Sequence, residues 1–153
     1  MLFNPTQEQV RRFFCGVYAK SQAGEPLQAI ETLAALWIAE HPEYHADLAD
    51  VEAAIARSYD ASRDGRSNPF LHLSMHLSIS EQCSIDQPAG IRQAVELLAS
   101  RMDSLHEAHH EVMDCLQDML WQSQTNQRPP DAAAYVQAVQ QRATRRLGQN
   151  LPR

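Results

Sequence analysis

The chain has 153 residues, of which 44% are hydrophobic and 21% charged, and its formal net charge is −6 at pH 7. This length and composition predict one globular domain covering residues 1–153. The acidic balance argues against nucleic acid as the main partner, because phosphate binding needs a basic surface, and no apolar run is long enough for a membrane span.

The cysteines indicate a reducing compartment. Cys15, Cys83 and Cys115 are odd in number, far apart and free of any CxxC spacing. The N-terminal residues also lack the charged and apolar regions of a secretion signal. We therefore expect a cytoplasmic protein with free thiols.

Three helices are predicted in the first 58 residues. Asn4 and Pro5 suit the cap and first position of a helix that carries apolar residues at helical spacing up to Tyr18. A second apolar stripe covers 27–38, and its helix should end near His41, because Pro42 disfavours helical geometry in the residue before it. Pro42 can itself start a third helix reaching about residue 55. The polar segment 59–68 is the clearest loop.

The segment 71–80 fits two structures. Its apolar residues alternate with His72, Ser74, His76, Ser78 and Ser80, which is typical of a strand. Projected on a helix, the same segment places both histidines within one apolar face. We favour the helix because no other segment offers a partner strand and a lone strand cannot satisfy its backbone. In a strand the two histidines would stand roughly 13 Å apart, too far to share an ion.

The second half of the chain predicts three more helices. The first begins near Ile91 and the second covers about 104–123. The third follows Asp131, which serves as its N-terminal cap. The expected fold class is therefore all-α, a helical bundle of about four principal helices with shorter additional helices. Its core should cover about 4–140, and 141–153 should form a frayed C-terminal tail.

The seven histidines are the most distinctive feature of the sequence. All belong to three H-x-x-x-H pairs or sit inside one: His41/His45, His72/His76 and His106/His110, with His109 inside the third. Residues i and i+4 share one face of a helix, where two imidazoles can chelate one ion.

Our interpretation is a transition-metal site between the 69–85 and 104–123 helices. The predicted ligands are His72, His76, His106 and His110, assisted by His109 or Asp114. Several imidazoles with few carboxylates suit zinc, nickel, copper or iron better than magnesium or calcium. The pair His41/His45 straddles a helix boundary, so we expect a structural junction with one histidine at most at a shared site.

Enzymatic activity stays open on the sequence. Residues 106–110 match HExxH, which makes Glu107 the general-base candidate, but no histidine follows as a third zinc ligand. The spacings Glu107-x-x-His110 and His109-x4-Asp114 also occur in di-iron and hemerythrin-like bundles, and both patterns are incomplete here.

A metal-free alternative has to be kept beside this interpretation. The histidines could be core and capping residues of a protein-interaction or homodimerisation module. Such a module would expose a patch such as Phe13, Phe14 and Tyr18. A pH-responsive histidine cluster is a third possibility.

Four stretches together resemble a known family. They are NPTQEQVRRFF, EHPEYH, NPFLHLSMHLSISEQCSIDQPAGIRQA (68–94) and RPPDAAAYV. They are similar to short proteobacterial proteins grouped as domain of unknown function 1841, from Asn4 to about Val139. The resemblance implies a small cytoplasmic helical protein with no assigned activity, and it transfers no catalytic residue.

Overall fold

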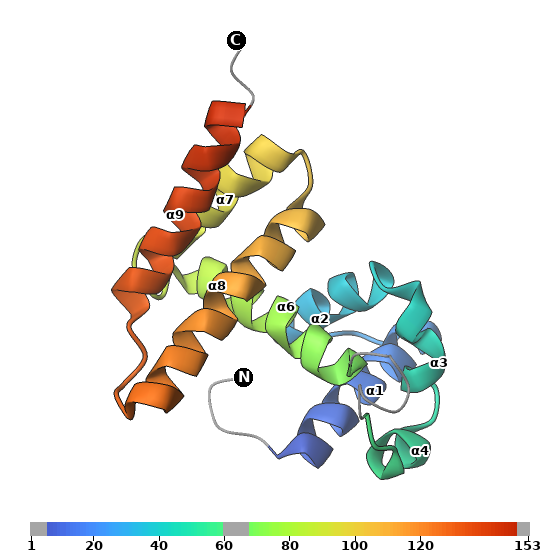
Figure 1. Cartoon of the computed structure of the whole chain (residues 1–153). Helices are drawn as coiled ribbons and strands as arrows, with labels where there is room; N and C mark the ends of the chain where they lie inside the picture. The colour runs from blue at the N-terminus through green and yellow to red at the C-terminus, as the bar shows by residue number, and fades with distance from the viewer. Residues whose placement is uncertain (1–5, 60–67, 150–153) are drawn as a thin grey trace. The chain divides into compact units, whose positions relative to one another are not determined.

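The computed structural model describes residues 6–59 and 68–149. These residues form eight α-helices and one short 3-10 helix and contain no strand, so the predicted all-α class is confirmed (Figure 1). None of the helices within these two ranges is long and apolar enough to cross a membrane.

The chain divides into two compact units, Met1–Ser78 and Ile79–Arg153. The division falls inside helix α6 (Pro69–Ile85), which contributes its first turns to one unit and its last turns to the other. The single domain that we predicted stays a prediction.

The first unit begins with α1 (Gln7–Ala23) and α2 (Ala29–Ala39). A capping box starts α1: the Gln9 amide donates to Thr6 Oγ1 (3.1 Å), and the Thr6 amide donates to Gln9 Oε1 (2.8 Å). The predicted Asn4–Pro5 cap lies outside the described residues. Gly24 ends α1 with φ 69°, a left-handed conformation that glycine adopts without a steric penalty.

The single third helix that we predicted is wrong, because three short helices take its place. They are η1 (Pro42–Tyr44), α3 (His45–Leu48) and α4 (Val51–Ala56). Pro42 does start the first of them. Asp50 interrupts the run: its backbone is extended, and its carboxylate accepts a hydrogen bond from the Ala53 amide (3.2 Å), which makes it the cap of α4.

The core of the first unit consists of apolar side chains from α1, α2, α3, α4 and α6. Its largest fully buried members are Phe14, Leu48, Phe70, Leu73 and Leu77. Phe13 and Tyr18 are half-buried and pack against this core. Phe13, Phe14 and Tyr18 therefore do not form the exposed patch that an interaction module would need.

The segment 71–80, for which the sequence allowed a strand or a helix, lies within helix α6. Asn68 caps it, with Oδ1 accepting from the Phe70 amide (2.9 Å), and the His72 amide donates to the Asn68 carbonyl (3.1 Å). Burial follows helical spacing: Phe70, Leu73 and Leu77 are buried, whereas Leu71 is 58% exposed. His76 is fully buried among the apolar side chains, so the alternation of polar and apolar residues does not mark a solvent face.

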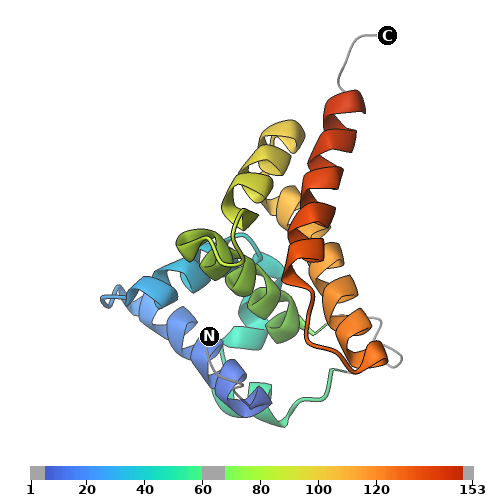
Figure 2. The same cartoon turned by 90° about the vertical axis from the view of Figure 1, so that its left-hand side faces the viewer.

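The second unit continues from α6 into α7 (Ile91–Met102), α8 (Leu105–Asn126) and α9 (Ala132–Gln149). These last three helices pack against one another, as Figures 1 and 2 both show. Asp131 caps α9 as predicted, with Oδ1 accepting from the Ala134 amide (3.0 Å). Helix α9 continues to Gln149, past residue 140, where we expected the core to end.

Candidate metal centre

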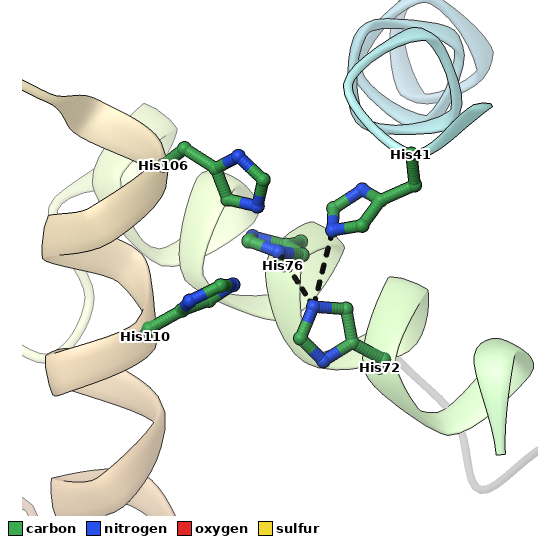
Figure 3. Close-up of side chains that lie close together, drawn as sticks. All are labelled: His41, His72, His76, His106 and His110. Carbon is green, nitrogen blue, oxygen red and sulfur yellow. Dashed lines mark hydrogen bonds between the residues drawn. The ribbon is translucent and has the colours of Figure 1, made fainter. Parts of the chain in front are cut away.

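Three imidazoles of the first unit bring their Nε2 atoms together. His72 and His76 stand one turn apart on α6, and His41 follows the end of α2. His72 Nε2 lies 3.1 Å from His41 Nε2 and 3.1 Å from His76 Nε2 (Figure 3). The ring planes of His72 are steeply inclined to those of His41 (75°) and His76 (81°), so the rings meet by their edges rather than stacking. We call His41, His72 and His76 the first-unit triad.

Hydrogen bonding alone does not account for this arrangement. A neutral imidazole nitrogen carries either one hydrogen or one lone pair in the ring plane. His72 Nε2 can therefore form one well-directed hydrogen bond, yet it has two nitrogen neighbours at the same distance. A metal ion held by three lone pairs satisfies all three atoms at once.

The spacing of these nitrogens also matches a coordination sphere. With metal–nitrogen bonds of about 2.0–2.1 Å, two imidazole nitrogens on one ion stand about 3.0 Å apart in octahedral and about 3.4 Å apart in tetrahedral geometry. The observed separations of 3.1 Å fall between these values.

The end of α2 determines how His41 is held. Its amide donates to the Ile38 carbonyl (3.1 Å), and the Trp37 carbonyl lies in the last turn of the same helix. His41 Nδ1 lies 2.7 Å from that carbonyl oxygen. A carbonyl can only accept, so Nδ1 must donate a hydrogen, and in the neutral ring the lone pair is then on Nε2, toward His72.

Aromatic rings enclose the triad. The Trp37 indole stacks on His76, with ring centres 4.0 Å apart and planes at 15°. The Tyr44 ring lies parallel to His41 at 5.2 Å. His41 is 2% exposed and His76 is fully buried. The triad is therefore shielded from water on the sides that these rings cover.

His45 does not join the triad, although it pairs with His41 in sequence. Its Nε2 donates to the Ile38 carbonyl (2.9 Å), and its ring contacts Tyr18 at 5.1 Å between centres. Of the two histidines at this junction, His41 alone belongs to the triad. His41 itself was absent from the predicted ligands, and the proline after it, which ends α2 there, was the available signal.

The second unit holds a pair of its own. His106 and His110 lie one turn apart on α8, with ring centres 4.6 Å apart and planes at 75°. Figure 3 draws both side chains on this helix. Ser104 starts α8 by accepting a hydrogen bond from the Glu107 amide (3.0 Å). We call His106 and His110 the second-unit pair.

The candidate ligands are the five histidines of the triad and of the pair, each described within its own unit, and every one offers one ring nitrogen. Among the residues that the structure describes, no carboxylate and no thiol belongs to this set. A cluster of histidines that could hold a metal ion is therefore present.

Three predicted site residues lie outside the candidate set. His109 is 2% exposed in the core of the second unit, where burial, with a smaller effect of His106 and His110, lowers its pKa to about 3. Asp114 pairs with Arg142 at 3.3 Å, and Glu107 is exposed. The metal-binding and general-base roles assigned to these residues stay predictions.

Comparison with known proteins identifies a family. The family model described as domain of unknown function (DUF1841) matches residues 6–141. Searches of curated proteins and of solved structures gave no match. The match covers most of the chain and confirms the family that the sequence resembles. The chain therefore belongs to the family of domain of unknown function 1841.

Proposed function

We propose that this protein binds one transition-metal ion through imidazole ligands. The first-unit triad forms the core of the site, and the second-unit pair, His106 and His110, completes it. The observation that carries the proposal is the position of His72 Nε2, 3.1 Å from the Nε2 atoms of both His41 and His76. The Trp37 carbonyl supports it, because it orients His41 as a metal ligand requires.

The chemistry of the ligand set narrows the metal. Imidazole suits zinc, nickel, copper and ferrous iron, whereas magnesium, calcium and manganese prefer oxygen ligands. With oxygen and sulfur ligands missing from the described candidate set, zinc, nickel, copper and iron are the proposed ions. The free cysteines support a reducing, cytoplasmic setting, which is part of the same proposal.

The pair is included for a chemical reason. Two imidazoles one turn apart are a weak site by themselves, and three leave coordination positions open on any of these ions. A shared ion would use both sets of donors. Assistance by His109 or Asp114, and catalysis by Glu107 on metal-bound water or dioxygen, are separate predictions for the same centre.

The test compares two glutamine variants. His72→Gln removes the central donor, whereas His45→Gln alters a histidine of an H-x-x-x-H pair that bonds to a backbone carbonyl instead. Loss of a group that only orients a ligand lowers metal affinity roughly 10–100-fold. His72→Gln removes a ligand itself, so it should lower metal affinity by more than that. The second should leave metal affinity near that of the unmodified protein. Calorimetric titration with zinc and nickel measures both, after circular dichroism has shown that both variants are folded.

Unchanged metal affinity and stoichiometry in His72→Gln would refute the proposal and favour the metal-free interaction module. A double variant, His106→Gln with His110→Gln, tests the second-unit pair. Weaker binding in the double variant supports a shared ion. Unchanged binding would confine the site to the first unit.

A further inference from the structure

A cavity of about 290 Å³ lies between the second half of α8 and the first half of α9, within the second unit. Its walls come from one face of each helix and from the loop 127–131 that joins them (Figure 1). Small-molecule sites have volumes of roughly 300–1,000 Å³. The cavity stands at the lower end of this range, so it suits a small molecule rather than a peptide or a nucleotide.

The inner part of the cavity is apolar. Cys115 and Tyr135 are 4% and 2% exposed, and Met119 and Ala138 beside them are half-buried. Burial raises the pKa of the Cys115 thiol, which therefore stays protonated and uncharged at neutral pH. The Tyr135 hydroxyl already donates to Gln82 Oε1 (2.8 Å). These groups can pack against an apolar part of a ligand and offer it no charge.

Charged side chains of both signs line the outer part of the cavity. Asp118 stands on α8, Asp131 at the start of α9, and Arg128 on the loop between the two helices. All three residues are exposed. Within the part of the chain that the structure describes, Arg128 forms no ion pair with either carboxylate. The outer part therefore offers one ligand a cationic and an anionic group.

Hydrogen bonds hold the loop at both of its ends. The Ser123 hydroxyl donates to the Arg128 carbonyl, and the Arg128 amide donates to the Ser123 carbonyl (3.1 Å). At the other end, Asp131 Oδ1 accepts from the Ala134 amide (3.0 Å). The backbone that carries the charged side chains is thus in place before a ligand arrives, which lowers the entropic cost of binding.

We propose that this cavity binds an apolar α-amino acid. The carboxylate of the amino acid pairs with the Arg128 guanidinium, and its ammonium pairs with Asp118, since Asp131 already caps α9. Its side chain packs against Cys115 and Tyr135. A simple anion would meet two carboxylates and a simple cation would meet the guanidinium, so a zwitterion fits the charges best. The inference goes beyond the metal site and uses none of its residues.

The experiment follows the amide signals of the full-length protein by NMR while L-leucine is added to millimolar concentration. Two half-ligands serve as controls: isoamylamine lacks the carboxylate, and isocaproate lacks the ammonium group. We expect saturable shifts of the signals of 115–138 with leucine. Each half-ligand should bind about tenfold more weakly or worse, because it loses one charge-assisted interaction.

A pair of variants tests the part played by Arg128. Arg128→Gln removes the cation of the cavity, whereas Arg145→Gln alters an exposed arginine of α9 that lies outside the cavity lining. Arg128→Gln should weaken leucine binding about tenfold or more. Arg145→Gln should leave it unchanged.

Several results would overturn the inference. The absence of saturable shifts with leucine is one, and shifts confined to α2 and α6 are another, since the amino acid would then bind at the metal centre instead. A half-ligand that binds as tightly as leucine would contradict a zwitterion site, as would equal leucine binding by the two variants. Metal content is measured separately, so failure of this inference leaves the proposed function standing.

Discussion

The carbonyl of Trp37 determines which nitrogen of His41 can bind a metal. That carbonyl lies in the last turn of α2, which ends at Ala39, before Pro42, and His41 Nδ1 donates to it. A local break in the chain thus orients a side chain that has to meet a histidine from a distant helix.

Trp37 also gives the site a spectroscopic signal. Its indole stacks on His76 at 4.0 Å between ring centres, whereas Trp121 is 66% exposed and lies eleven residues beyond His110 on α8, roughly 16 Å along the helix. We expect saturating copper or nickel to quench most of the Trp37 emission in a Trp121→Phe variant. Fluorescence titration measures this. The reciprocal variant Trp37→Phe, which retains Trp121, should change little, and an unresponsive Trp37 would place the metal elsewhere.

The sequence could predict part of the site at this scale. H-x-x-x-H spacing is a local property, so it identified His72 with His76 and His106 with His110 as same-face pairs. The spacing could not distinguish His41 from His45. In the structure His41 bonds to a backbone carbonyl through Nδ1 and presents Nε2 to His72, whereas His45 uses its Nε2 on a carbonyl. This difference depends on where α2 ends and on what packs against that end.

Among the helices, α1 and α4 depend on one buried arginine. Arg11 Nη1 donates to the Ala54 carbonyl (2.8 Å) and the Arg57 carbonyl (2.6 Å), where α4 ends. Arg11→Met should lower the free energy of unfolding by about 2–3 kcal/mol, since it leaves buried carbonyls without a donor. Chemical denaturation monitored by circular dichroism measures the loss.

Arg12 provides the matched control for that variant. Its side chain is 51% exposed and pairs with Glu8 and Glu52 at the surface. Arg12→Met should cost no more than about 1 kcal/mol. Equal losses from the two substitutions would contradict the role given to Arg11.

The turn between α6 and α7 depends on the charge of Asp86. Its Oδ1 accepts from the amides of Gly90 (3.2 Å) and Arg92 (3.1 Å), and these hydrogen bonds lower its pKa below the ordinary 3.8. A lowered folded pKa means that the carboxylate stabilises the fold above pH 3.8, and that this contribution disappears as the pH falls through the folded value.

Asp86→Asn isolates the charge, since asparagine keeps an acceptor oxygen and tolerates the positive φ of 51°. We expect the variant to melt at a lower temperature than the unmodified protein at pH 7, and the difference to shrink in acid. Thermal unfolding across this pH range measures it. A difference that is independent of pH would contradict a role for the charge.

Element prediction succeeded where local signals agreed. The Asp131 cap of α9 was predictable, because an aspartate before a helical pattern has one common use. The break between α3 and α4 was missed although Asp50 is the same kind of signal, since the apolar spacing continued across it. The helix at 71–80 was predicted only because no other segment could serve as a partner strand. The alternating pattern of the segment by itself predicts a strand.

For the whole molecule, a bound metal ion should stabilise the folded state. An ion bound to the native state alone stabilises it by RT ln(1 + [L]/Kd), about 2.7 kcal/mol at a hundredfold excess over Kd. We expect added zinc or nickel to raise the melting temperature and a chelator to reverse the rise. His72→Gln should show little of either effect.

Amide hydrogen exchange can show in which unit the bound ion protects the backbone. If His106 and His110 share it with the triad, metal should slow amide exchange in α8 as well as in α2 and α6. Protection limited to α2 and α6 would contradict a shared ion and leave a site of three histidines.

The most direct test of the account is elemental analysis of untagged protein purified without chelating resin or added metal. The account predicts close to one transition-metal ion per chain, and the identity of that ion would narrow the chemistry of the site. Protein that is metal-free as purified, and that takes up no zinc, nickel, copper or ferrous iron on titration, would contradict it.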